Sequence, residues 1–291
     1  MVGCVWISKH IKALAARIVL VGAAMCCNAP DARADAPQRV VSMNLCTDQL
    51  AMMLATEGQL LSVSQIALDT HVSPMAEEAR GYRINYGQAE DIYLMRPDLV
   101  LAGEYTPRTT VDMLRGLGIR VEIFAITSSL DEVTDQLAKM GAVLHREAQA
   151  QAIIADFQTR RATLASEAGP RPAAIFYYAN GFTSGAGSLA NDILELAGFS
   201  NAAIEAGYGW GQKMPLEVLA LTDPDLVITT TPYPGGSRAE DVMQHPVVKA
   251  IQDSRATAAV TDHDWVCGTP FVLRAAEQLA DLRRSMTGVQ P

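Results

Sequence analysis

The chain has 291 residues, 49% of them hydrophobic, and a formal net charge of −9 at pH 7. A chain of this length can bury one large core or two modest ones. No stretch is strongly basic, which argues against nucleic acid as a partner.

The first 34 residues have the layout of a secretory signal. Basic residues within the first 17 positions precede an apolar run from Ile18 to Cys27, and Ala32-Arg33-Ala34 supplies a small-residue cleavage site before Asp35. The apolar run is too short to span a bilayer. Lipidation at Cys26 is the alternative, but the residue before it is Met25, where a small residue is wanted. We therefore expect residues 1–34 to be a signal peptide that is cleaved on export to the periplasm.

Short apolar runs alternate with helical patterns in the first half of the mature chain. Strands are expected at 39–44, 60–64, 98–102 and 120–124, and helices at 47–54, 90–95, 108–117 and 130–144. Thr47 or Asp48 is the expected cap of the first helix. This alternation predicts a mostly parallel sheet that helices cover on both faces.

The second half repeats this scheme after the breaker Pro170-Arg171-Pro172. Strands are expected at 173–178, 225–230 and 256–261, and helices at 188–197, 214–221, 246–253 and 270–286. The segments EDIYLMRPDLVLAG (90–103) and LEVLALTDPDLVIT (216–229) look alike, with an acidic helical turn, a Pro-Asp pair and a buried strand in each. This internal echo favours two similar lobes over one domain.

A long helical pattern separates the two halves. Residues from His145 to Ala168 contain no Gly or Pro, and about 22 helical residues would span about 33 Å. We expect an α/β protein with two lobes, each a mostly parallel sheet flanked by helices, joined by this one long rigid helix. An ordinary surface helix of one larger domain is the alternative. The expected organisation is a signal peptide at 1–34, an N-terminal lobe at 35–144, an inter-lobe helix at 145–168 and a C-terminal lobe at 169–291.

Loops after parallel strands face the ligand crevice of such sheets, so the loops at 45–47, 65–75, 103–107, 179–187 and 262–269 are candidates for the site. Aromatic residues fall in or near predicted loops: Tyr86, Tyr105, Phe182, Tyr208, Trp210, Tyr233 and Trp265. Aromatic walls suit a large planar organic ligand between two lobes. Packing in the core or at the rim is the alternative for each of them.

Other chemistry finds weaker support in the sequence. The stretch NGFTSGAGS (180–188) lacks both the Lys-Ser/Thr of a P-loop and the third Gly of a dinucleotide fingerprint. The mature histidines are scattered without metal spacing, so no metal site and no cofactor are expected, although His71 and His263 would lie on cleft loops of opposite lobes. No Gly-x-Ser-x-Gly elbow occurs. A secreted hydrolase that uses a cleft histidine is the rival from another functional class.

Cys46 and Cys267 are the two cysteines outside the expected signal. One pair is not a disulfide framework, but in an oxidising compartment it could form one bond. A nucleophilic role for either cysteine is the alternative. We predict the Cys46–Cys267 disulfide.

Several segments, in order and spacing, resemble the helical-backbone class of periplasmic binding proteins for iron-siderophores and vitamin B12. These are RVVSMNLCTDQL (39–50), EDIYLMRPDLVLAG, the long helix, FTSGAGSLANDILELAGFSN (182–201) and WVCGTPFVLRAAEQL (265–279), and the similarity covers about residues 38–287. The resemblance implies two α/β lobes on one rigid helix, no catalysis, and delivery of a metal chelate to the permease of an ABC importer with its ATPase. A monomer is expected.

Within that class the sequence looks most similar to cobalamin binders. Phe182, Thr183, Ser184 and Gly185 match the loop that meets the corrin, and Trp210 and Trp265 match aromatic wall positions. The resemblance thus implies that the ligand is cobalamin or a related corrinoid. Ferric siderophore or haem stays open as the alternative, because Arg80, Arg83, Arg108, Arg238 and Arg274 could supply cations for an anionic chelate.

Two acidic residues, Glu90 and Glu217, match the pair that docks onto arginines of the permease in that class, one per lobe. They open corresponding helices of the two echoing segments. Solvated first-turn acids, favoured there by the helix dipole, are the alternative.

Overall fold

A computed structural model describes residues 35–165, 169–231, 235–254, 256–260 and 262–288. The expected signal peptide lies outside these residues. Five parallel strands form the first sheet, in the order β3-β2-β1-β4-β5. Their bounds are Val40–Ser42 (β1), Leu60–Ser64 (β2), Arg83–Asn85 (β3), Leu99–Gly103 (β4) and Arg120–Phe124 (β5). All five residues of β4 are buried, as expected for a strand that helices cover on both faces.

Alternate residues of these strands pack against helices on opposite faces of the sheet. Val40, Leu99 and Leu101 face α2 (Leu45–Leu54) and α6 (Leu130–Leu144). Val41 and Val100 belong to a second apolar cluster, with residues of α4 (Ala89–Leu94) and α5 (Arg108–Gly116). The short helices η1 (Gln65–Leu68) and α3 (Ala76–Ala79) lie between β2 and β3 in the chain.

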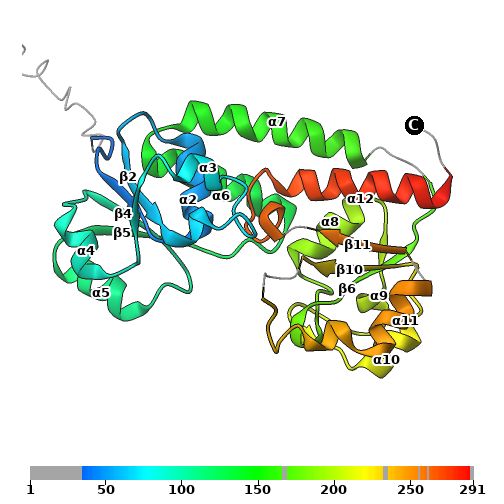
Figure 1. The fold of residues 1–291 in the computed structure, drawn as a ribbon. Helices are drawn as coiled ribbons and strands as arrows, with labels where there is room; N and C mark the ends of the chain where they lie inside the picture. Colours follow the sequence, from blue (N-terminus) through cyan, green and yellow to red (C-terminus); the bar gives the residue numbers. More distant parts are fainter. Residues whose placement is uncertain (1–34, 166–168, 232–234, 255, 261, 289–291) are drawn as a thin grey trace, which may run out of the picture. The chain divides into compact units, whose positions relative to one another are not determined.

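The second sheet has four parallel strands in the order β11-β10-β6-β8. Their bounds are Ala173–Phe176 (β6), Ser200–Asn201 (β8), Leu226–Thr230 (β10) and Ala256–Val260 (β11). The helices α8 (Leu189–Leu196) and α12 (Val272–Thr287) cover one face, and α9 (Ala202–Glu205), α10 (Leu216–Thr222) and α11 (Pro246–Ser254) cover the other (Figure 1). Both sheets are therefore parallel and flanked by helices, as the alternating pattern predicts.

Short elements complete the second half. An antiparallel pair joins β7 (Phe182–Thr183) to β9 (Gln212–Lys213). Three turns of 3-10 helix are η2 (Ala179–Gly181), η3 (Asp241–Gln244) and η4 (Asp262–Asp264). Among the helices that the structure describes, none is long and apolar enough to cross a membrane.

The long helix between the halves is shorter than expected. It is α7 (Glu147–Ala165), and His145, at φ 58°, ends α6 instead of continuing into it. The two helices meet closely, because a Cβ on Gly141 of α6 would lie 2.5 Å from the Cβ of Ala150. α7 runs beside α12 (Figure 1), where Arg160 and Glu277 form an ion pair at 2.7 Å. The last three residues of the expected helix, 166–168, lie outside the described part.

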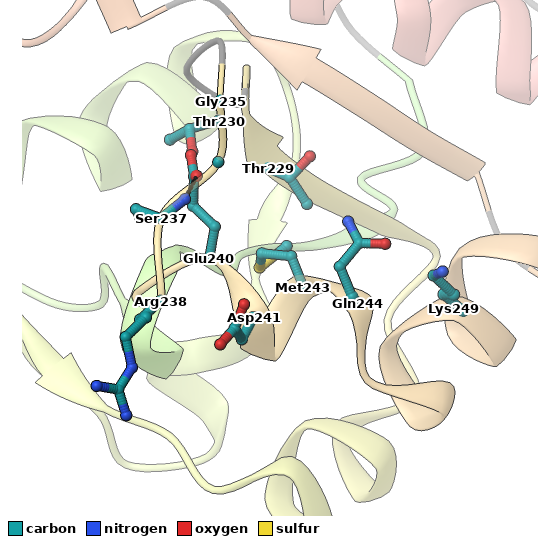
Figure 2. A pocket seen from close by; sticks show the side chains of 11 residues that line it. Thr229, Thr230, Gly235, Ser237, Arg238, Glu240, Asp241, Met243, Gln244 and Lys249 are labelled. Carbon is teal, nitrogen blue, oxygen red and sulfur yellow. Dashed lines mark hydrogen bonds between the residues drawn. The ribbon is translucent and has the colours of Figure 1, made fainter.

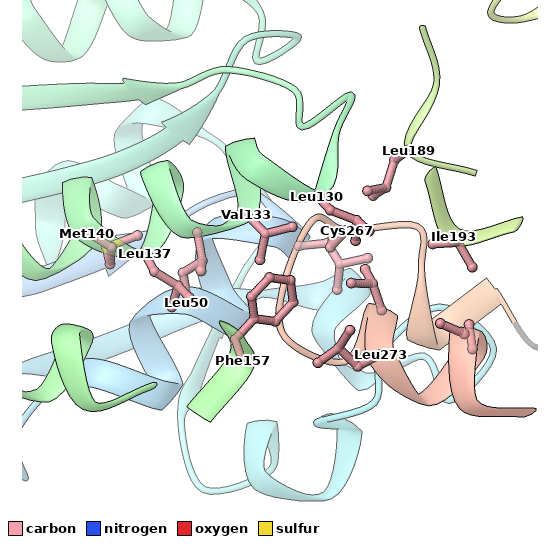
Figure 3. Close-up of a cluster of buried hydrophobic side chains, with 14 of the residues drawn as sticks. Leu50, Leu130, Val133, Leu137, Met140, Phe157, Leu189, Ile193, Cys267 and Leu273 are labelled. Atoms are coloured by element: carbon pink, nitrogen blue, oxygen red, sulfur yellow. The ribbon is translucent and has the colours of Figure 1, made fainter. Parts of the chain in front are cut away.

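One apolar cluster includes residues from both halves of the chain (Figure 3). Phe157 of α7 is in this cluster with Leu130 of α6, Leu189 of α8 and Leu273 of α12. The described residues from Pro37 onward form one compact unit. The lobe boundaries expected at residues 144 and 168 therefore stay a prediction.

The two echoing segments have the same local structure. Asp98, just before β4, accepts a hydrogen bond from the N–H of Arg39 at 3.0 Å, and its own N–H donates to the Arg39 carbonyl. Asp225, just before β10, makes the same pair of hydrogen bonds with Ala173. In each half this aspartate holds the start of one central strand against the start of the strand beside it in the sheet.

Candidate ligand-binding site

The first candidate site lies at the carboxyl end of the first sheet. The strand order reverses between β1 and β4, and ligands of open α/β sheets bind at this switch point. A cavity of about 240 Å³ is found there. It is lined by Asn44, Cys46, Thr47, Leu50, Gly103, Glu104, Tyr105, Phe124, Ala125, Ile126, Thr127, Gln136, Val266 and Gly268. We refer to it as the switch-point cavity.

Asn44 shapes the floor of this cavity. Its Oδ1 accepts hydrogen bonds from the N–H groups of Cys46 and Thr47, at 3.0 and 3.4 Å, so Asn44 is the N-cap of α2. The expectation that Thr47 or Asp48 caps this helix was wrong, since both lie inside it. A Cβ on Gly103 would come within 2.8 Å of the Asn44 amide, so glycine at this position lets the end of β4 lie close to the Asn44 side chain.

The opposite wall comes from the far end of the chain. Cys267 forms a disulfide with Cys46, with the two Cα atoms 5.2 Å apart. Beside it, the hydroxyl of Thr269 donates to Gln49 Oε1 at 3.1 Å. Gly268 packs so closely on Thr127 that a Cβ there would overlap its side chain. These contacts hold Val266 and Gly268 against the edge of the first sheet, so the cysteines are bonded and structural in this state.

The charge of the cavity is unsuited to an anionic ligand. Glu104 is the single acidic residue among its lining residues, and no Lys or Arg lines it. Tyr105, predicted as a ligand residue, lies at its mouth with 76% of its surface exposed. Tyr86, also 65% exposed, follows β3 at the same end of the sheet but does not line the cavity.

The second sheet has its own switch point, between β6 and β10. Trp265 packs there against Phe176 at the end of β6 and against Tyr178, with ring centroids 5.2 and 5.6 Å away. Trp265 is partly buried in the main apolar cluster. It is therefore part of an aromatic stack of the fold, and only the exposed part of its surface could meet a ligand.

The loop from Phe182 to Gly185 is held from both sides. The Thr183 hydroxyl donates to the Phe176 carbonyl at 2.7 Å, and the Ser184 carbonyl accepts from the buried amide of Asn201 at 3.0 Å. Thr183 and Ser184 are both buried. A Cβ on Gly185 would come within 1.9 Å of the Tyr208 carbonyl oxygen, so this position requires glycine.

The same loop pairs with the segment that carries Trp210. Gly185 N–H donates to the Gly209 carbonyl at 3.1 Å, and β7 pairs with β9 on the other side of Trp210. Trp210 itself is 58% exposed. Phe182 is partly buried, with Lys213 Nζ 5.2 Å above its ring. The structure thus brings together the two segments that were predicted separately to meet the ligand.

A second cavity, of about 620 Å³, lies at the carboxyl end of β10 (Figure 2). Thr229, Thr230 and the 235–244 segment line it, together with Lys249. Its charges are mixed, because Arg238 and Lys249 are accompanied by Glu240 and Asp241. Tyr233, one of the aromatic candidates, lies outside the described residues.

The histidines do not form a metal site in the part of the chain that the structure describes, where no group of three or more metal-ligating side chains is found. His71 lies 3.2 Å from Asp69, and His263 contacts the Thr70 carbonyl at 3.3 Å and Asp264 at 3.4 Å. Loops 65–75 and 262–269 are therefore in contact.

Glu90 and Glu217 are exposed, and each is the second residue of its helix, α4 and α10. Each lies eight residues before the aspartate of the matching Asp98–Arg39 or Asp225–Ala173 contact. The two glutamates thus occupy corresponding positions in the two halves.

Several residues of the switch-point cavity were not predicted individually, above all Asn44, Glu104 and Gln136. Asn44 is the last residue of an expected strand, and Glu104 lies in the loop 103–107 that the carboxyl-end rule selected, but neither side chain was distinguished from its neighbours. Gln136 comes from the middle of α6, and no local pattern distinguishes it from other polar residues of that helix.

Comparison with known proteins gives consistent matches. The family model for periplasmic binding proteins matches residues 40–257. A cobalamin-binding protein of Halobacterium salinarum is 28% identical over 198 residues, which are 66% of this chain and 54% of that protein, so the chain spans about half the length of this relative. The vitamin B12-binding protein of Pectobacterium carotovorum is 24% identical over 265 residues, which are 88% of this chain and 90% of that protein.

Solved structures share the fold. A periplasmic haem-binding protein of Pseudomonas aeruginosa superposes with a TM-score of 0.66 at 21% identity, covering 88% of this chain and 94% of that one. The periplasmic vitamin B12-binding protein of Vibrio cholerae gives 0.63 at 20% identity, covering 87% and 99%. The α/β fold with two sheet-containing lobes is thus that of these binding proteins. The chain belongs to the periplasmic binding protein family, whose members are binding proteins and not enzymes.

Proposed function

We propose that this protein is the periplasmic component of an ABC importer and captures cobalamin or a related corrinoid. The observation that carries the proposal is the switch-point cavity, which no basic side chain lines and beside which Tyr105 is largely exposed. Trp210 is exposed on a loop that we expect to meet the ligand. Exposed aromatic rings on binding loops suit a large macrocycle with an uncharged periphery. The names of the two relatives in the sequence comparison support the same ligand class.

Anionic chelates fit less well. A catecholate siderophore or the propionates of haem would be expected to meet cations in the site. Arg80 pairs with Glu77, and Arg274 stacks on Phe271 and lies 3.7 Å from Asp264. Arg83 and Arg108 line neither of the two cavities described above. Arg238 lines the second cavity, where two acids offset its charge.

A hydrolase finds no support in the geometry. The cysteines form a disulfide, so neither offers a thiolate nucleophile. The family is one of binding proteins.

The ligand can be tested directly. Native mass spectrometry of protein purified from its own periplasm should show a bound corrinoid mass. Calorimetry with cyanocobalamin, haem and several ferric siderophores should give heat with the corrinoid alone. Trp210→Ala should weaken that binding by about 1–3 kcal/mol if buried area dominates. Tighter binding of haem or a siderophore would replace the corrinoid assignment, and no binding of any chelate would refute the proposed function.

Docking to the permease is proposed for Glu90 and Glu217. Their corresponding positions in the two halves suit a two-fold symmetric partner that presents the same basic surface twice. Exposed carboxylates opposite arginines give orientation and association rate more than affinity, and their effect should fade with salt.

Replacing both glutamates with arginine should therefore leave corrinoid affinity almost unchanged while abolishing uptake and coupled ATP hydrolysis in reconstituted vesicles. The matched control is the double variant Asp135→Arg and Glu205→Arg, which changes the net charge equally at two other exposed helical acids. Normal transport by the Glu90 and Glu217 variant would show that these residues are solvated first-turn acids.

A further inference from the structure

We infer that the switch-point cavity is a subsite for a neutral, hydrogen-bond-donating side arm of the ligand, namely a primary carboxamide, and that it rejects a carboxylate at the same place. This inference rests on the proposed corrinoid function and goes further, because it assigns one cavity to one functional group. A corrin ring carries primary amides on its periphery, whereas haem carries carboxylates.

The size of the cavity fits an arm and not a macrocycle. Its volume is about 240 Å³. Pockets that enclose whole drug-sized ligands measure about 300–1,000 Å³, and a corrinoid is larger than a typical drug. The ring would therefore lie outside, near Tyr105 at the mouth, while an arm enters between Asn44 and Gln136.

The cavity offers an acceptor that lacks a donor. Gln136 Nε2 donates to the Ala125 carbonyl at 3.4 Å, which fixes the orientation of the amide because the carbonyl can only accept. Gln136 Oε1 is buried and has no hydrogen-bond partner among the described residues. An acceptor left in this state is unfavourable, and an amide N–H from a ligand would satisfy it.

Glu104 adds a negative charge to the same wall. Its Oε2 accepts from the N–H of Ile126 at 3.3 Å. Lys139 contacts one lining residue from outside the cavity: its Nζ lies 4.5 Å above the Phe124 ring and donates a hydrogen bond to the Ile123 carbonyl. A ligand carboxylate would therefore lose water and meet Glu104 with no basic residue in the lining to offset it. An amide N–H faces the same oxygens favourably.

The disulfide makes this subsite rigid. Cys46 and Cys267 both adjoin it, and the bond fixes Val266 and Gly268 in the wall opposite Glu104. A preformed site binds its group without first having to order it.

The test compares two corrinoids with each other. Dicyanocobinamide carries primary amides around the ring, whereas dicyanocobyrinic acid carries carboxylates in their place. Calorimetry should show cobyrinic acid binding about 100-fold or more weakly than cobinamide to the unaltered protein, which corresponds to about 2.7 kcal/mol. Glu104→Gln should lower the ratio of the two dissociation constants about tenfold, because it removes the repulsion between Glu104 and a ligand carboxylate. Gln136→Leu should weaken cobinamide about tenfold and leave cobyrinic acid unchanged.

Glu122→Gln is the matched control. It removes the same net charge from β5, but Glu122 pairs with Arg120 at 2.9 Å and does not line the cavity. This variant should leave the ratio unchanged. If the unaltered protein binds cobinamide but Glu104→Gln and Glu122→Gln give the same ratio, the amide subsite is refuted while the corrinoid function stands. If the unaltered protein binds neither corrinoid, both the proposed function and the subsite are wrong.

Discussion

Asp48 offers a sharp test of the electrostatics of α2, the helix that contributes Thr47 to the switch-point cavity. It lies in α2, fully buried, and accepts hydrogen bonds from both the hydroxyl and the N–H of Ser64. Burial raises the pKa of this carboxyl from its ordinary 3.8 to about 6, and the hydrogen bonds from Ser42 and Ser64 offset only part of that effect. Protonation of Asp48 is therefore more favourable in the folded protein than in the unfolded chain.

The sign of the pH dependence follows from this raised pKa. The stability that the neutral acid contributes is fully present below about pH 3.8 and is lost as the pH rises through about 6. A pKa of 3.8 in the unfolded chain and about 6 in the folded protein corresponds to about 3 kcal/mol of unfolding free energy that is lost at neutral pH. Asp48→Asn removes the titration, and an asparagine can still accept from the Ser64 N–H and donate to its hydroxyl.

Urea unfolding at several pH values between 4 and 7.5 measures this effect. We expect Asp48→Asn to be about as stable as the unaltered protein near pH 4 and more stable by up to about 3 kcal/mol at pH 7.5. Asp135→Asn, an exposed acid on α6, is the control and should show no such divergence. A stability difference for Asp48→Asn that does not change with pH would refute the raised pKa.

Three other predictions concern the walls of the site. Replacing Cys46 and Cys267 together with serine should lower the unfolding free energy by up to about 5 kcal/mol on the chain-entropy model, measured by urea unfolding; two titratable thiols in the unreduced, denatured protein would rule the bond out. Gly185→Ala should lower the melting temperature and weaken chelate binding, because its methyl group would force the Tyr208 segment away; calorimetry showing unchanged affinity would contradict the close packing of this loop. Trp265→Ala should cost about 3 kcal/mol of stability through the lost aromatic stack, whereas Trp210→Ala should cost less than about 0.5 kcal/mol; thermal unfolding that ranks them the other way would refute the assigned burial.

Strongly patterned elements could be predicted closely from the sequence. β2, β5 and α6 have the expected bounds, and α4 is displaced by one residue. By contrast, β3 (RIN) and β8 (SN) were missed. Neither has an apolar pattern of its own, and each is a strand because a neighbouring strand offers its edge, β2 and β6 respectively. Pairing of this kind depends on distant residues and leaves no local trace.

The break before α7 shows another limit of periodicity. The helix expected to start at His145 begins only at Glu147, because His145 adopts a left-handed conformation that ends α6. The chain turns there because Gly141 lets α7 pack against α6 at Ala150. That contact stabilises the turn at His145, and no single residue near His145 predicts the turn from the sequence.

The aromatic candidates show why residue type alone could not define the site. Trp210 and Trp265 were assigned the same role, but Trp210 is largely exposed while Trp265 stacks on Phe176 and Tyr178. The difference depends on which strand end each loop packs against. The order of strands in the sheet determines that contact, and the spacing of residues along the chain does not reveal the order.

The internal echo has a structural consequence that connects the fold to the site. Asp98 holds the start of β4 against the start of β1, and Asp225 holds the start of β10 against that of β6. In both sheets these are the strand pairs where the strand order reverses. Fixing their amino ends sets the register of the pair, and the register determines which residues stand at the carboxyl ends. The same aspartate contact, used twice, therefore positions Asn44 beside Gly103 in the first sheet and Tyr178 near the end of β10 in the second, at the two ends where a ligand is expected to bind.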